Sequence, residues 1–406
     1  MGTLSPAGVG TLSPAGVEAP GPTRVYNHIT ELIGNTPLLR LNNLGLPETI
    51  ALYAKLEFYN PSGSVKDRAA VAMIETAERS GRLKPGGVLV EATAGNMGLG
   101  IALAALGRGY RVICVVPTKF SAEKQSLLRA LGAEVLNTPR ADGMLGADAK
   151  AEQLLTEIPG AIALRQFVNP QNPEAHYLTT GPEIYEALGG QVDYFLAGAG
   201  SGGTYSGIAR YLKERDISTR CILADPVGST IGGGVHGDYD IEGIGNDFIP
   251  STMDMSLVDR VIKVTDTAAL STLRLLARAE GLIVGTSSGA AAWAALSLTR
   301  DLARSRAAGC QATDAFARGL EEALPDGDPA ADAVRQGVSL QGGQGTADIG
   351  RQLASLQGGH DTVNSGRQSA HLQGAQTTIN IVTILPDRGD RYFSKGVYDL
   401  EDGGGI

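Results

Sequence analysis

The strongest constraint on the fold is a repeated alternation of short apolar runs with segments of helical spacing. Arg111–Pro117 reads RVICVVP, and a helical pattern follows at 122–131. Further strands are expected at 88–90, 194–197, 221–225, 261–264 and 379–385, and further helices at 98–106, 207–215, 266–280 and 290–298. Runs that are apolar throughout are typical of parallel strands buried on both faces. The sequence therefore predicts an α/β fold with ligands bound beyond the carboxyl ends of the strands.

The size and charge of the chain narrow the classes of function. With 406 residues we expect two domains or lobes plus additional segments. The net charge of −9, with no basic block, argues against nucleic acid or anionic membrane as a partner. No apolar run reaches the ~18 residues that cross a bilayer, and no secretory signal is visible. Three isolated cysteines predict no metal site and a cytoplasmic location.

Two segments are expected to lie outside the folded body. Residues 1–25 contain a tandem duplication of GTLSPAGV and predict a flexible tail. Residues 304–376 contain 16-residue repeats that are rich in glycine. This segment is interpreted as a low-complexity insertion, although a stacked repeat or a partner-binding arm is an alternative. The catalytic domain would then comprise 26–303 plus 377–406.

A glycine-rich loop follows one apolar strand and opens a helix. Residues 198–204 read GAGSGGT. Small residues let backbone N–H groups surround an anion at a helix N-terminus, so this loop predicts a phosphate site. A dinucleotide could occupy a similar loop, but the acidic residue expected ~20 residues later is only loosely matched by Asp225. A simple strand–helix turn is the remaining alternative.

Lys66 lies where the motif PSGSVKD meets the start of a helical pattern. A helix N-terminus and partial burial both disfavour a cation, and both therefore lower the pKa of a lysine placed there. A neutral amine is what Schiff-base chemistry needs. On spacing alone, a surface lysine at the start of a helix is the favoured explanation of the pattern.

Two further loops contain small and polar residues before a helix. The first reads EATAGNMG at 91–98, and its backbone N–H groups and Asn96 could bind a carboxylate. The second reads GTSSG at 285–289, and a serine there could cap the helix or bond a ligand nitrogen. An ordinary turn and an ordinary helix cap are the alternatives.

In combination, the ordered motifs resemble the cysteine synthase and cystathionine β-synthase family of pyridoxal-phosphate (PLP) enzymes. The matching segments are IGNTPL at 33–38, PSGSVKDR at 61–68, EATAGNMG at 91–98, the run at 166–184, GAGSGGT at 198–204, EGIGNDFIP at 242–250, GTSSGAA at 285–291 and LPDRGDRY at 385–392. The resemblance implies a two-lobed, three-layer αβα fold with largely parallel sheets, the tryptophan-synthase-β-like fold type II. It also implies a small mobile lobe at roughly 66–165 and a homodimer.

The same resemblance implies a role for each matching residue. Lys66 would form the Schiff base and transfer the proton at the substrate Cα. The implied cofactor-binding residues are Lys66, Asn96, Gly200, Ser201, Gly202, Gly203, Thr204 and Ser287. The implied substrate-binding residues are Thr93, Ala94, Gly95, Met97, Gln166, Gly243 and Gly245. Met97 departs from the family, which usually has a hydroxyl there, and this puts substrate choice in question.

The implied reaction is a β-replacement that forms a sulfur amino acid. The first expectation is cysteine synthase, which converts O-acetylserine and sulfide to cysteine and acetate. Cystathionine β-synthase, with serine or O-acetylserine and homocysteine, is the alternative, and EGIGNDFIP and DPVGS (225–229) look closer to that branch. A catalytically idle binding protein with the same fold is the alternative from another class.

Overall fold

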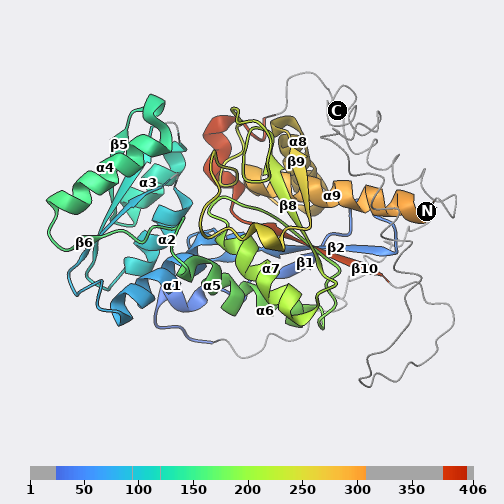
Figure 1. The fold of residues 1–406 in the computed structure, drawn as a ribbon, viewed down its shortest axis with the longest axis horizontal. Helices are drawn as coiled ribbons and strands as arrows, with labels where there is room; N and C mark the ends of the chain where they lie inside the picture. Colours follow the sequence, from blue (N-terminus) through green and yellow to red (C-terminus); the bar gives the residue numbers. More distant parts are fainter. Residues whose placement is uncertain (1–23, 94, 119, 308–377, 400–406) are drawn as a thin grey trace, which may run out of the picture.

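The computed structural model describes residues 24–93, 95–118, 120–307 and 378–399, which form two α/β domains (Figure 1). Most of the predicted tail, most of the predicted insertion and Ala94 lie outside these residues. Each domain is built on its own sheet, one of six strands and one of four. The prediction of a three-layer α/β fold with largely parallel sheets is confirmed.

The large domain has the strand order β1-β2-β10-β7-β8-β9. Its strands are β1 (Leu38–Arg40), β2 (Ile50–Leu56), β7 (Tyr194–Gly198), β8 (Arg220–Pro226), β9 (Arg260–Val264) and β10 (Ile379–Leu385). Among the strands that the structure describes in this sheet, only β1 pairs antiparallel; β10 lies between β2 and β7 and is parallel to both. A strand from the end of the chain therefore completes the centre of the sheet.

Helices cover both faces of the large sheet. On one face lie α5 (Gln171–Leu178), α6 (Thr180–Ala187) and α7 (Gly203–Arg215); on the other lie α8 (Asp266–Glu280) and α9 (Thr286–Ala307). The first face packs Tyr205 and Ile208 against Phe195. The second packs Leu276 against Ile222. Each of these side chains is at most 2% exposed, so the central strands are buried from both sides, as their apolar sequences require.

The small domain is a parallel sheet in the order β5-β4-β3-β6. Its elements are β3 (Val88–Ala92), β4 (Arg111–Pro117), β5 (Glu134–Thr138), β6 (Ala161–Ile162), α1 (Lys66–Arg79), α2 (Asn96–Ala105), α3 (Ala122–Ala130) and α4 (Gly143–Glu157). Residues of α1, α2 and α3 share one core cluster with the sheet, and α4 packs on its other face. These elements fall within the lobe proposed at roughly 66–165.

Short 3-10 helices occur at η1 (Ile29–Leu32), η2 (Glu57–Tyr59), η3 (Arg140–Asp142), η4 (Met255–Leu257) and η5 (Gly389–Lys395). In the described part of the chain, no helix meets the length and hydropathy needed to traverse a bilayer. The same residues contain no group of three or more His, Cys, Asp and Glu side chains arranged to hold a metal ion.

Several predicted boundaries were wrong. The helix predicted at 207–215 begins at Gly203, because the glycine-rich loop itself enters the helix. The helix predicted at 290–298 runs from Thr286 to Ala307. It therefore includes residues 304–307, with which the proposed insertion begins.

Candidate active site

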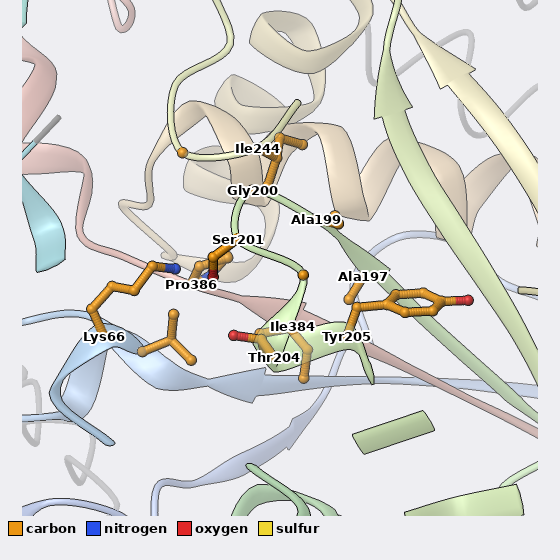
Figure 2. Close-up of a pocket in the computed structure, with 14 residues that line it drawn as sticks. Lys66, Ala197, Ala199, Gly200, Ser201, Thr204, Tyr205, Ile244, Ile384 and Pro386 are labelled. Atoms are coloured by element: carbon orange, nitrogen blue, oxygen red, sulfur yellow. The ribbon is translucent and has the colours of Figure 1, made fainter. Parts of the chain in front are cut away.

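A pocket opens where the carboxyl ends of β7 and β10 meet the start of α1 (Figure 2). Among the residues lining it are Lys66, Gly200, Ser201, Gly202, Thr204 and Gly243. These come from three segments that are far apart in sequence. Such a position, beyond the carboxyl ends of parallel strands, is where an α/β fold binds ligands.

The loop between β7 and α7 needs glycine at three positions, either for close approach or for a left-handed backbone. A Cβ on Gly200 would lie 2.4 Å from the Gly243 carbonyl oxygen. Gly202 has a left-handed φ of 83° at the helix N-cap, and a Cβ on Gly203 would lie 2.1 Å from the Asn172 side chain. Without side chains there, the backbone N–H groups at the start of α7 face the pocket. This cradle fits a phosphate group.

Three polar side chains hold the outer side of this loop. Asn172 donates a hydrogen bond to Ser201 Oγ at 2.9 Å, and Asn246 donates to the Gly200 carbonyl at 2.7 Å. Thr252 donates to the Ser201 carbonyl. Sequence reasoning did not single out these three residues; Asn172 and Asn246 do fall within segments that resembled the family. They fix the loop from behind and leave its inner face available.

Lys66 is the first residue of α1, and its side chain extends into the pocket toward Ser201 (Figure 2). Burial of the amine lowers its pKa below the ordinary value; the cation of Lys124 lowers it further, and the carboxylate of Asp387 opposes both. The backbone N–H of Val65 donates to the Pro386 carbonyl at 2.8 Å, which ties the start of α1 to the end of β10. The pocket therefore contains an amine that is biased toward its neutral form.

A buried ion cluster anchors α1 behind Lys66. Arg68 contacts Glu57 and Glu183, each at 2.7 Å, and Lys55 contacts Glu183 at 2.6 Å. Burial alone would raise the pKa of Glu57, but the Arg68 guanidinium outweighs it and lowers the pKa to about 2. Sequence analysis missed this cluster, because its members are spread from β2 to α6.

The loop between β3 and α2 is held by its own threonine. Thr93 is buried, and its hydroxyl accepts hydrogen bonds from the N–H groups of Gly95 at 3.0 Å and Gly98 at 3.3 Å. Gly95 has φ 128°, which favours glycine. The Met97 side chain is 2% exposed and packs in the core of the small domain. A carboxylate bound here would therefore meet the backbone of Met97 and not its side chain.

Asn96, at the first position of α2, is held by the C-terminal segment. Its amide donates to Asp387 at 2.7 Å and accepts from Arg391 at 2.9 Å. Asp387 also accepts from Tyr392 at 2.6 Å, and its second carboxylate oxygen is buried without a hydrogen-bond partner among the described residues. The Asp387 carboxylate, which opposes the lowering of the Lys66 pKa, therefore lies next to Asn96, which the family resemblance implies as a cofactor contact.

A second buried ion pair connects the two domains. Lys124 of α3 contacts Glu242 at 2.8 Å and donates to the Tyr392 hydroxyl at 2.9 Å. Lys395 also donates to Glu242. Lys124 and Glu242 have side chains only 3% and 7% exposed. We call the group Asn96, Lys124, Glu242, Asp387 and Tyr392 the interdomain network.

The remaining predicted residues surround the pocket without all lining it. Ser287 is buried in the first turn of α9, and a Cβ on Gly243 would lie 3.8 Å from its Oγ. The N–H of Gly245 donates to the Ala199 carbonyl at 2.8 Å. The Gln166 carbonyl accepts from Asn172 at 2.8 Å, which links it to the loop at 200–203. Ala94 lies outside the described residues.

Comparison with known proteins matches this chain to one family. The profile described as pyridoxal-phosphate dependent enzyme matches residues 29–313. The chain is 52% identical over 272 residues to an O-acetylserine dependent cystathionine β-synthase of Bacillus subtilis (strain 168), covering 67% of this chain and 89% of that one. It is 42% identical over 282 residues to a cysteine synthase of Staphylococcus aureus (strain N315), covering 69% and 91%. It is 46% identical over 290 residues to a cystathionine β-synthase of Apis mellifera, of which it spans 58%.

Solved structures agree with these sequence matches. An O-acetylserine dependent cystathionine β-synthase from Helicobacter pylori superposes with a TM-score of 0.69 at 35% identity, covering 93% of this chain and all of that chain. A cysteine synthase from Entamoeba histolytica gives a TM-score of 0.71 at 29% identity, covering 96% and 95%. The glycine cradle, the buried amine of Lys66 and these likenesses lead to one conclusion: the chain belongs to the pyridoxal-phosphate dependent enzymes of the cysteine synthase and cystathionine β-synthase family.

Proposed function

We propose that this protein catalyses β-replacement of the acetoxy group of O-acetylserine by the thiol of homocysteine, giving cystathionine and acetate. The observation that carries the proposal is the 52% identity to a relative named for this reaction, against 42% to the relatives named cysteine synthase. The Helicobacter pylori structure named for the same reaction supports it. Sulfide as the nucleophile, the first expectation from sequence, becomes the second candidate.

The proposed roles follow from the pocket. The N–H groups at 200–203 and the Thr204 hydroxyl bind the cofactor phosphate, and Lys66 holds the cofactor covalently. Asn96 and Ser287 are proposed to contact the cofactor ring. When bound, pyridoxal phosphate withdraws electron density from the Cα of the amino acid. After the α-amino group of the substrate has displaced the Lys66 amine from the cofactor, that neutral amine takes the Cα proton and later returns it.

The substrate carboxylate is proposed to bind on the loop that begins at Thr93. The Thr93 hydroxyl is already used inside this loop, so the loop offers its backbone N–H groups. Gly95 has a left-handed φ that opens the turn, and Gln166 and the Gly243–Gly245 segment would close the other side. Binding there would bring the small domain toward the phosphate loop and exclude water.

A competition assay tests the proposed reaction. The holoenzyme receives O-acetylserine with equal concentrations of homocysteine and sulfide, and mass spectrometry measures cystathionine and cysteine. We expect cystathionine to dominate, with acetate released in an amount equal to the sum of the two products. Dominant cysteine would contradict the proposal and support cysteine synthase. No product and no absorbance near ~410 nm would support the idle-protein alternative.

The homodimer and the cytoplasmic location stay predictions. Light scattering coupled to size-exclusion chromatography measures the first directly. A mass of about 84 kDa, twice the 42.0 kDa of the chain, is expected.

A further inference from the structure

His176 lies directly behind the proposed phosphate site. It belongs to α5, is 0% exposed, and uses both ring nitrogens. Its Nδ1 is 2.9 Å from the Thr180 hydroxyl, and its Nε2 is 3.2 Å from the Thr204 hydroxyl. A Cβ on Gly207 would lie 2.8 Å from the His176 Cβ, so α5 and α7 are in close contact here. The ring is therefore fixed between two hydroxyl groups.

The imidazole of His176 is neutral at physiological pH. Burial lowers its pKa to about 3; the cations of Arg68 and Lys66 lower it further, while Glu57 and Glu183 oppose this. A neutral imidazole has one N–H donor and one acceptor nitrogen. The ring must therefore donate to one of the two threonines and accept from the other.

The hydrogen bonding of Thr204 indicates which of the two tautomers of His176 is compatible with a bound phosphate. Thr204 lines the pocket, and its hydroxyl points into the space shared with the Lys66 amine (Figure 2). A hydroxyl has a single proton to donate. A phosphate dianion only accepts, so the proton of Thr204 must point to the phosphate. The hydroxyl can then only accept a hydrogen bond from His176.

We propose that His176 is a positioning residue for cofactor binding, which as the Nε2–H tautomer donates to Thr204 and so directs the Thr204 proton into the phosphate loop. Thr180 then donates to Nδ1. The inference rests on the proposed role of Thr204 in binding phosphate. His176 would not touch the cofactor itself. It would set the direction of the hydrogen bond that Thr204 donates to the cofactor phosphate.

Nitrogen-15 NMR of the holoenzyme reads the tautomer directly. The chain has only five histidines, and a His176→Gln sample assigns the signal of this one. We expect a neutral ring with the proton on Nε2. A proton on Nδ1, or a doubly protonated ring, would overturn the proposal.

Cofactor affinity provides an independent test. Apoenzyme of the wild type, His176→Leu, Thr204→Val and the double variant is titrated with pyridoxal phosphate, and folding is checked by circular dichroism. Each single change is expected to weaken binding by roughly 10-fold or more, the usual effect of losing a hydrogen bond to a charged group. The double variant should be no weaker than the weaker single one, because His176 acts on the phosphate only through the Thr204 hydroxyl.

The outcomes separate this inference from the proposed reaction. If His176→Leu weakens binding equally with and without Thr204, its effect is structural and the inference fails. Unchanged affinity in Thr204→Val would remove the premise and overturn it as well. Neither experiment contains O-acetylserine, homocysteine or sulfide. A failed competition assay would therefore refute the reaction and leave the tautomer result standing.

Discussion

The phosphate loop and the interdomain network lie around one pocket but are built in different ways. The loop is a continuous run from Gly198 to Thr204 between one strand and one helix. Three hydrogen bonds of the network join residues that are 118, 268 and 291 positions apart in sequence. The loop depends on the absence of side chains, and the network depends on buried charges finding partners. A local motif can therefore hold the cofactor, whereas the electrostatic environment of Lys66 depends on the whole fold.

Breaking the network should have the largest effect on stability. Glu242→Gln leaves Lys124 buried without its full counter-charge, which costs about 3–5 kcal/mol for a pair of this kind. Urea unfolding measures the loss. Glu152→Gln is the matched control, because its partner Arg165 and Glu152 itself are more than half exposed, and we expect at most about 1 kcal/mol there. Equal losses of unfolding free energy in the two variants would contradict the claim that the buried ion pair contributes more to stability than the exposed one.

A substitution in the phosphate loop should have a smaller energetic effect, which we expect to appear as weaker cofactor binding. Gly203→Ala places a methyl group 2.1 Å from the Asn172 side chain, and overpacking of this kind costs about 1–3 kcal/mol. Cofactor affinity should fall by about 5- to 150-fold, measured by titration of apoenzyme. Gly237→Ala is the control, since its nearest contact would be an ordinary 3.6 Å. Similar affinities for the two variants would show that the cradle is not closely packed.

This contrast explains how much the sequence could predict. The apolar runs at 111–117 and 379–385 are strands as expected, because a run buried on both faces carries its own signal. The glycine loop was recognisable because tight approach needs glycine wherever it occurs. The partners of Asp387, Lys124 and Glu242 could not be predicted, because the sequence around each residue does not indicate which distant residue it contacts in the fold. Met97 was expected at the substrate, but its side chain faces the small-domain core.

Glu91 forms a third long-range contact. Its hydrogen bonds join the strand before Thr93 to the segment that contains Gln166. Its carboxylate accepts N–H bonds from Leu164, Arg165 and Gln166 at 3.1–3.3 Å. Burial nevertheless raises its pKa to about 7. Between pH ~4.5 and ~7 the folded state then binds more protons than the unfolded state, so stability falls as pH rises.

Glu91→Gln should remove this pH dependence. The wild type is expected to lose up to about 1.4 kcal/mol per pH unit more than the variant across this window. Urea unfolding at intervals from pH 4.5 to 8 measures the difference between the two slopes. Parallel curves for the two proteins would show that Glu91 does not carry a raised pKa.

The smallest effect is expected from removing the proposed insertion. Residues of α9 and β10, which flank residues 308–377, pack in the core of the large domain. Replacing 308–376 by a flexible Gly-Ser linker should change cofactor affinity and turnover by less than about twofold, because the closure entropy of a flexible linker depends only weakly on its length. Activity assays and cofactor absorbance measure this. A large loss would show that the segment contributes to the catalytic domain.

The attachment point of the cofactor tests the account most directly. Borohydride reduction of the holoenzyme, followed by proteolysis and mass spectrometry, locates the lysine that carries pyridoxal phosphate. We predict a single modified peptide with the added mass on Lys66, and none in Lys66→Ala. A modification on another lysine, or an unmodified Lys66 in a saturated enzyme, would contradict the assignment of this pocket.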